Sequence, residues 1–168
     1  MKKLLVVLGI WLAGCASTEN HLQRTPQNEM LIMQFVDASI KGDFDEMRSL
    51  LADSFKLYGP ALGDSTDAGG MIARDRKAWT EDFSSIAYDR YAILSVSMKE
   101  GRVKGDWVLD WGKVTFNYKN GRTPVTFWYH CASRVKSGKI EIQRIFYDGV
   151  DIANQLKGQP APMSLEFN

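Results

Sequence analysis

Residues 105–148 read GDWVLDWGKVTFNYKNGRTPVTFWYHCASRVKSGKIEIQRIFYD and decide the fold. Two short turns, Asn120-Gly121 and Ser137-Gly138, separate three runs that are rich in β-branched and aromatic residues. Asn-Gly between such runs is a strong hairpin signal, because a type I′ turn needs a positive φ at both central residues. The stretch therefore predicts three consecutive antiparallel strands.

The turn positions also predict which residues face each other. A two-residue turn at each site puts Arg134 opposite Glu141 and Lys113 opposite Trp128, which are favourable cross-strand pairs. Alternate residues share a face, and a slip of one residue would exchange the two faces. We expect the more apolar face to meet the helices. That face carries Val108, Asp110, Val114, Phe116, Phe127, Tyr129, Cys131, Ile140, Ile142, Arg144 and Phe146.

Helices are predicted on both sides of these strands. The segment from Asn28 to Lys41 has apolar residues at helical spacing. Asp43 and Glu46 form a capping box for a second helix, Phe44–Leu51. Along the rest of the chain we expect a short strand Phe55–Tyr58, a flexible loop Gly59–Gly70, a helix Met71–Phe83, a strand Tyr88–Lys99, and a last helix from its cap Asp148 to Lys157.

Residues 1–14 have the order of a secretion signal. Lys2 and Lys3 precede the apolar run Leu4–Leu12, which is too short for a transmembrane helix of about 20 residues. The sequence that ends at Cys15, L-A-G-C, resembles the bacterial lipobox, whose cysteine is lipidated and becomes the mature N-terminus. The alternative is an ordinary signal peptide in which Cys15 has no role.

The lipobox implies a lipid anchor in the bacterial cell envelope. Neither of the two residues after Cys15 is Asp, which resembles the enterobacterial signal for the outer membrane, on its periplasmic side. We therefore expect a signal peptide over 1–14, a lipidated N-terminus and tether over 15–27, one domain over 28–157, and a disordered tail over 158–168.

The composition excludes several classes of function. The whole chain has a formal net charge of +1, and removing Lys2 and Lys3 leaves one more acidic than basic residue, so nothing favours nucleic acid. Once Cys15 is lipidated, Cys131 is the only other cysteine, so no intramolecular disulfide can form. No spacing typical of metal ligands or of a phosphate-binding loop occurs, and we expect no metal and no cofactor.

The order of elements, with Ala38–Asp43, Gly138–Ile140 and Phe146–Asp148, resembles the nuclear transport factor 2-like superfamily, and within it the SnoaL-like polyketide cyclases. The resemblance covers about residues 29–157. It implies an α+β fold in which a curved antiparallel sheet wraps around helices and encloses a conical apolar pocket, often in a dimer. The superfamily includes isomerases, cyclases, dehydratases, epoxide hydrolases and non-catalytic binders, so the resemblance implies no single reaction.

Asp110 is the most informative candidate for chemistry. It lies in mid-strand on the apolar face, where a carboxylate is costly unless it is paired or protonated. The predicted register puts Arg144 in the same row, and a turn at Glu100-Gly101 would put Tyr91 beside it. One hypothesis makes Asp110 a general acid or base tuned by burial and by Arg144. The alternatives are a structural Asp110–Arg144 ion pair or an Asp that faces water in a non-catalytic pocket.

Six aromatic side chains are candidates for the wall of a ligand pocket. They are Tyr58, Trp79, Phe83, Tyr91, Phe127 and Tyr129. The alternative is that these rings only fill the core. His130 falls on the opposite face from Asp110, so we expect no catalytic dyad. Cys131 is expected to be a small buried hydrophobe, because no base lies near it on its own face.

The second face of the strands is rich in tryptophan. It carries Trp107, Trp111 and Trp128, together with Leu109, Ile145 and Tyr147. Large exposed apolar patches usually mark an interface, and Trp, Tyr and Arg are enriched in interface cores. We therefore expect a homodimer that packs sheet to sheet. The alternatives are that the last helix or the tail covers this face, or that the register is slipped.

Three functional hypotheses remain open. The first is a membrane-anchored domain that binds a small apolar or amphipathic molecule in the conical pocket. The second is an isomerase, cyclase or dehydratase that uses Asp110. The third is a structural or interaction lipoprotein whose cone is filled and whose tryptophan face is the working surface.

Overall fold

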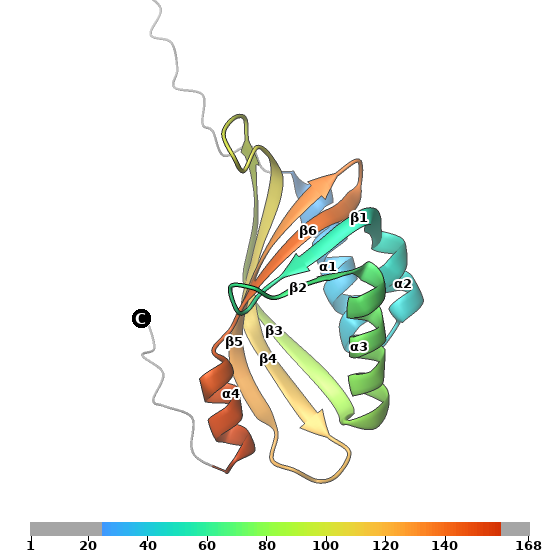
Figure 1. Cartoon of the computed structure of the whole chain (residues 1–168), viewed down its shortest axis with the longest axis vertical. Helices are drawn as coiled ribbons and strands as arrows, with labels where there is room; N and C mark the ends of the chain where they lie inside the picture. Colours follow the sequence, from blue (N-terminus) through green and yellow to red (C-terminus); the bar gives the residue numbers. More distant parts are fainter. Residues whose placement is uncertain (1–24, 159–168) are drawn as a thin grey trace, which may run out of the picture.

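The helices of the first half of the chain pack against one side of a long, curved sheet (Figure 1). This computed structural model describes residues 25–158, so Cys15, most of the predicted tether and the predicted tail from residue 159 lie outside the described residues. The helices are α1 (Pro26–Lys41), α2 (Phe44–Leu50), α3 (Ala68–Glu81) and α4 (Gly149–Leu156). The strands are β1 (Leu51–Tyr58), β2 (Ser65–Asp67), β3 (Phe83–Met98), β4 (Gly105–Tyr118), β5 (Val125–Lys136) and β6 (Lys139–Phe146). No helix within residues 25–158 is long and apolar enough to cross a membrane.

The sheet has the strand order β2-β1-β6-β5-β4-β3. The predicted α+β class, with a curved sheet on N-terminal helices, is confirmed. The prediction of a purely antiparallel sheet is wrong at one pair, because β1 runs parallel to β6. The last strand of the meander β4-β5-β6 lies beside β1, which precedes α3 in the chain. Strand β6 runs in the same direction as β1, so the two strands pair in parallel.

Several element boundaries differ from the prediction. Helix α1 begins at Pro26, inside the predicted tether, and β1 begins at Leu51 rather than Phe55. The segment predicted as a flexible loop contains the strand β2 and the start of α3. Asp67 caps this helix, because its side chain accepts a hydrogen bond of 2.9 Å from the backbone N–H of Gly70. The helix ends at Glu81, and Phe83 begins the long strand β3.

The predicted register of β4 and β5 is confirmed along its length. Asp110 lies opposite Cys131, and Lys113 lies opposite Trp128. The predicted register of β5 and β6 holds only at the turn, because a bulge at Glu141 shifts it by one residue. Beyond the bulge the two faces of β6 are exchanged, so Arg144 lies opposite Ala132 on the outer face.

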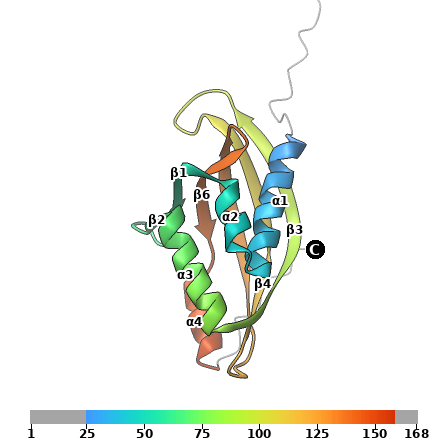
Figure 2. The same cartoon turned by 90° about the vertical axis from the view of Figure 1, so that its right-hand side faces the viewer.

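Helices α1, α2 and α3 cover the concave side of the sheet (Figure 2). The core forms where their apolar residues meet this side, and burial of such residues is the main force that stabilises the fold. It includes Ile32, Phe35, Ala38, Phe44, Met47, Leu50, Leu51, Phe55, Leu57, Met71, Val108, Cys131, Val135, Ile140 and Ile145. The helix α4 contacts β5, and among the described residues none of α4 is buried.

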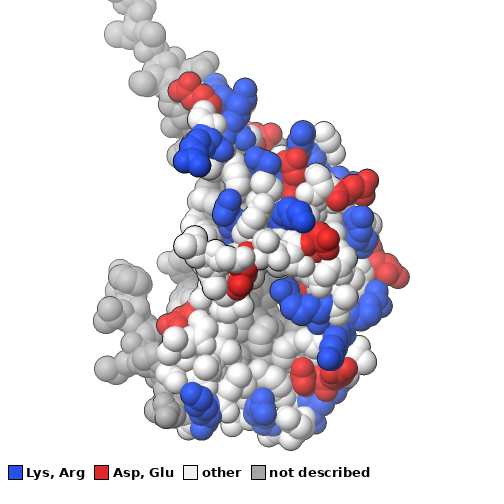
Figure 3. Space-filling model, in the orientation of Figure 1, with Lys and Arg blue, Asp and Glu red and all other residues white. Residues whose placement is uncertain are grey.

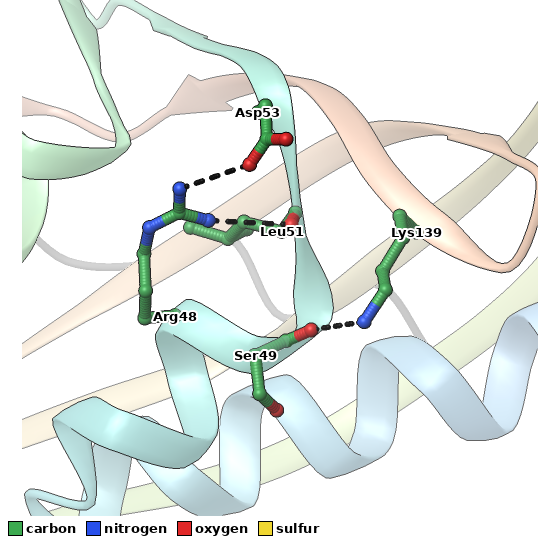
Figure 4. A network of polar contacts seen from close by, with 5 residues as sticks. All are labelled: Arg48, Ser49, Leu51, Asp53 and Lys139. Carbon is green, nitrogen blue, oxygen red and sulfur yellow. Dashed lines mark hydrogen bonds and ion pairs between the residues drawn. The ribbon is translucent and has the colours of Figure 1, made fainter.

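Polar contacts hold the junction between α2 and β1 (Figure 4). The Arg48 guanidinium donates to the Leu51 carbonyl at 3.4 Å and to the Asp53 carboxylate at 3.2 Å. The Lys139 ammonium donates to the Ser49 carbonyl. These bonds satisfy carbonyls at the end of α2 and tie this end of the helix to the start of β6.

Candidate functional site

A cavity of about 490 Å³ lies between the concave side of the sheet and the helices. Its wall combines residues of α1, α2, α3 and α4 with residues of every long strand. Most of the wall is apolar or aromatic, namely Phe35, Val36, Ile40, Phe44, Met47, Leu57, Met71, Ala78, Trp79, Phe83, Ile86, Val114, Phe116, Phe127, Ile145 and Ile152. A volume of this size is typical of sites for small molecules.

Four of the six predicted pocket aromatics line this cavity. Trp79, Phe83, Phe127 and Tyr129 belong to its wall. The side chain of Tyr58 does not, and the Arg144 guanidinium lies 4.7 Å from the centre of its ring.

The prediction that Tyr91 lies beside Asp110 is wrong. A bulge between Arg90 and Ala92 leaves Tyr91 without a cross-strand partner, and its side chain is 76% exposed. Its ring packs edge-on against Trp128 on the outer face, with 5.9 Å between the ring centres. Ile93 takes the position opposite Asp110, because Met98 pairs with Gly105 and the connection is therefore longer than the predicted turn at Glu100-Gly101.

Asp110 is buried, with a side chain only 1% exposed. Its ion-pair partner is Arg90, whose Nε lies 3.0 Å from Oδ1, and the predicted partner Arg144 lies on the other face. Within residues 25–158 the second oxygen, Oδ2, has no hydrogen-bond partner. Burial raises the pKa of Asp110 above its ordinary value, and Arg90 and the Tyr88 hydroxyl lower it in part.

Tyr88 lies between Asp110 and the cavity. Its ring forms part of the cavity wall, whereas Asp110 does not. The ring crosses β4 at Gly112, where a Cβ atom would come within 2.4 Å of Tyr88 Cε2. A glycine at this position therefore makes room for the ring, and Tyr88 links the carboxylate to the cavity wall.

A second polar group enters the wall at Gln143. Its side-chain amide donates to Ser133 Oγ at 3.3 Å, and that oxygen lies 3.4 Å from the thiol of Cys131. Burial raises the pKa of Cys131 to about 11, so the thiol is neutral and unreactive at neutral pH. The expectation that Cys131 is a small buried residue is confirmed.

An ion pair on α3 completes the polar part of the wall. Arg74 lies 2.8 Å from Asp75 Oδ1, and both residues line the cavity. Burial raises the pKa of Asp75, and the neighbouring Arg74 lowers it in part. The cavity is thus mainly apolar, with polar atoms at a few separate points. Among residues 25–158 no group of three or more His, Cys, Asp or Glu side chains could hold a metal ion.

The outer face of the sheet differs from the predicted one. Ile145 and Tyr147, which we expected there, line the cavity because of the bulge at Glu141. Trp107 is buried, and its Nε1 donates to the Val103 carbonyl at 2.8 Å. Trp128 remains 49% exposed.

The rings on this face form stacked groups. His130 lies between Trp111 and Phe146, with ring centres 4.6 Å and 5.7 Å apart. Lys113 lies 5.0 Å from the centre of the Trp128 ring, as the register predicts. His130 and Asp110 are on opposite faces, which confirms that they form no dyad.

Sequence reasoning missed Arg90, Tyr88 and Gln143. Arg90 and Tyr88 alternate on β3, so a correct register for β3 and β4 would have placed both on the inner face beside Asp110. Gln143 was assigned to the outer face, and only the bulge at Glu141 brings it inside.

Comparison of the sequence with protein-family models finds no match, and neither does comparison with curated proteins. Solved structures do match. A putative SnoaL-like polyketide cyclase from Shewanella denitrificans has a TM-score of 0.64 at 10% identity, over 80% of this chain and 100% of that one. An LEH-like epoxide hydrolase from M. tuberculosis has a TM-score of 0.62 at 18% identity, over 80% and 92%. A nuclear transport factor 2-like protein of unknown function from Burkholderia pseudomallei has 0.60 at 15%, over 77% and 96%.

The chain has the nuclear transport factor 2-like fold. At these identities the likeness shows the fold alone. The site of this nuclear transport factor 2-like chain must therefore be argued from its own side chains.

Proposed function

We propose that this protein is a membrane-anchored domain that binds a small apolar or amphipathic molecule in the cavity. The observation that carries the proposal is a mainly apolar cavity of about 490 Å³ with a few separate polar groups in its wall. Transfer of apolar surface from water into such a wall is favourable by about 25 cal/mol per Å². The polar atoms of Tyr88 and Gln143 would orient a ligand that carries one polar group.

A substitution that fills the cavity tests this proposal. Ala78 of α3 lines the cavity, whereas Ala73 of the same helix is exposed and does not. We expect Ala78→Trp to reduce the affinity for anilinonaphthalene sulfonate, an amphipathic fluorescent probe, at least tenfold, because the indole takes up the ligand's space. Ala73→Trp is the matched control and should bind like the wild type. Equal affinity in both variants would reject the cavity as the binding site.

The membrane anchor rests on the sequence L-A-G-C that ends at Cys15, outside the described residues. We expect Cys15→Ser in the full chain to abolish incorporation of labelled palmitate and to release the protein from the membrane fraction. Fractionation of the host envelope would test whether the protein is in the outer membrane. Equal palmitate labelling of the variant and the wild type would end this part of the proposal.

An enzyme is the second candidate. Two observations favour it: Asp110 Oδ2 has no partner within residues 25–158, and the Tyr88 ring lines the cavity. Asp110 is not part of the wall, so a role as general acid or base would pass through the Tyr88 hydroxyl. If the protein hydrolyses any member of a panel of epoxides, Asp110→Asn should lose turnover and keep probe affinity. Undiminished turnover in Asp110→Asn would remove Asp110 from catalysis.

The third hypothesis, a protein with a filled cone, is disfavoured by the cavity. We still propose that the aromatic outer face of the sheet, which this hypothesis uses, is a homodimer interface. Trp107 is buried within the chain, so the proposed interface rests on Trp111, Trp128, Tyr91 and Phe146. We expect the wild type to sediment as a dimer and Trp128→Glu as a folded monomer. A wild-type monomer at high micromolar concentration would refute the interface.

A further inference from the structure

The loop between β3 and β4 is an exposed basic segment at one end of the sheet. Residues 99–104, KEGRVK, are all exposed and carry three basic side chains against one acidic one. The turn between β5 and β6 is a neighbour of this loop, because Asp106 lies opposite Val135. Lys136 is exposed at the start of that turn, and its ammonium lies 3.7 Å from the Glu141 carboxylate. Figure 3 shows Lys and Arg side chains at this end of the domain, with acidic side chains beside them.

Apolar side chains are exposed within the same segment. Val103 in the loop is 50% exposed, and Met98 at the end of β3 is 39% exposed. The Val103 carbonyl accepts the indole hydrogen bond of Trp107, which holds the loop against the sheet. Basic side chains are attracted to anionic lipid headgroups, and exposed aliphatic side chains gain free energy when they leave water for the membrane interface.

The described chain begins at this same end. The backbone N–H of Thr25 donates to the side chain of Ser95. The backbone N–H of Ser95 in turn donates to the Glu29 carboxylate at 2.9 Å. Ser95 is on β3, three residues before Met98. The segment from Cys15 to Thr25 can reach about 35 Å when extended, so a lipid on Cys15 would keep this end near the bilayer.

We propose that the loop between β3 and β4 docks on a membrane surface that contains anionic phospholipids. Arg102 and Lys104 lie against the phosphate groups, and Val103 enters the headgroup region. The cavity lies at the other end of β3, because Ile86 in its wall is about 40 Å from Met98 along the strand. The docked domain therefore holds its cavity away from the bilayer. This inference rests on the proposed anchor only for the delivery of the domain to the membrane.

Vesicle sedimentation tests the docking without the anchor. The mature chain from residue 15, with Cys15→Ser, lacks the lipid and keeps the whole core, which lies within residues 25–158. We expect it to bind vesicles of equal parts phosphatidylglycerol and phosphatidylcholine, and to bind vesicles of phosphatidylcholine alone much more weakly. Added salt should weaken the binding to the anionic vesicles, because it screens the charges.

Two double variants of equal charge separate the loop from the net charge of the protein. Arg102→Ser with Lys104→Ser should weaken binding roughly 25-fold, since each basic residue near an anionic surface strengthens binding about fivefold. Lys77→Ser with Arg122→Ser removes two positive charges from α3 and the β4–β5 loop, toward the opposite end of the domain, and should leave binding unchanged. Val103→Ser should weaken binding while the salt dependence stays the same.

Equal losses in the two double variants would overturn the inference, because the net charge alone would then explain the binding. The absence of binding to anionic vesicles would also overturn it. If the wild type is found in the membrane fraction through Cys15 but the unlipidated chain binds no vesicle, the docking surface is refuted and the anchor stands.

Discussion

Asp110 and Arg90 form an ion pair on the concave side of the sheet. The Asp110 side chain is 1% exposed and that of Arg90 24% exposed, so neither charge is fully solvated. A buried ion pair adds little net stability, but removal of one partner leaves a buried charge without compensation. The pair therefore makes the stability of the fold sensitive to substitution and to pH at this point.

Arg90→Met should destabilise the protein by about 3 kcal/mol at neutral pH. The substitution removes a cation that lowers the pKa of Asp110, so this already raised pKa rises further. A carboxyl group whose pKa is higher in the folded state stabilises the fold below its unfolded-state pKa, and this contribution is lost as the pH rises through the folded-state pKa. The deficit of Arg90→Met should therefore shrink as the pH falls.

Denaturant unfolding at several pH values measures this deficit. Arg144→Met is the matched control, because Arg144 is exposed and packs on the Tyr58 ring outside the cavity. It should cost less than about 1 kcal/mol at every pH. A larger deficit in Arg144→Met than in Arg90→Met would contradict the observed register.

Gly112→Ala should destabilise the protein by about 1–3 kcal/mol and displace Tyr88, because the new methyl group overlaps the Tyr88 ring and lies within 2.6 Å of the Asp89 carbonyl oxygen. Gly63→Ala is the control, since a Cβ atom there meets nothing within 4 Å. Thermal melts measure the stability, and the probe titration reports the cavity. An unchanged melt in Gly112→Ala would show that Tyr88 does not cross β4 at this position.

At the scale of elements, the sequence predicts the register of β4 and β5 along its length and fails for the pairs β3–β4 and β5–β6. The register predicted from Asn120-Gly121 holds between β4 and β5, although the connection runs from Tyr118 to Val125 and Asn120 lacks the positive φ of a type I′ turn. Both central residues have a positive φ at Ser137-Gly138 instead. The bulges at Tyr91 and Glu141 involve neither Gly nor Pro, so no residue type marks them. Asp110 was predicted on the correct face, but the bulge at Glu141 puts its predicted partner Arg144 on the other face. Tyr91 was assigned wrongly because the loop between β3 and β4 is longer than the predicted turn at Glu100-Gly101.

The helices α2 and α4 have equivalent caps but unequal support from the core. The Asp43 side chain accepts from the Glu46 N–H, and the Asp148 side chain accepts from the N–H groups of Val150 and Asp151. Buried residues of α2 belong to the core, whereas among the described residues none of α4 is buried. Helix α4 is attached to β5 mainly through two hydrogen bonds between Gln155 and the Thr126 backbone.

Substitution of the two caps should therefore have different consequences. Asp148→Ala should speed amide hydrogen exchange in α4 alone, because loss of the cap costs about 1 kcal/mol in a helix that opens locally. Asp43→Ala should lower the free energy of global unfolding by a similar amount, because α2 unfolds with the core. Faster exchange throughout the sheet in Asp148→Ala would show that α4 is part of the cooperative core.

At the scale of the whole molecule, the fold has two ends with different properties. The end of the sheet near α4 contains the cavity, and the other end carries the basic loop beside the start of the described chain. Order and spacing of the elements predict this architecture from the sequence. The volume of the cavity could not be predicted, because it depends on side-chain packing between α3, α4 and the sheet.

The central claim is that the cavity, and not the aromatic outer face, binds the small molecule. Methyl NMR of the protein during titration with anilinonaphthalene sulfonate tests it most directly. The account predicts that the largest shifts occur at the cavity methyl groups of Ile40, Met47, Ile86, Val114, Ile145 and Ile152. Methyl groups outside the cavity, in Met98, Val103, Val125 and Val150, should stay unchanged. Saturable binding that leaves the cavity methyl groups unshifted would contradict the account.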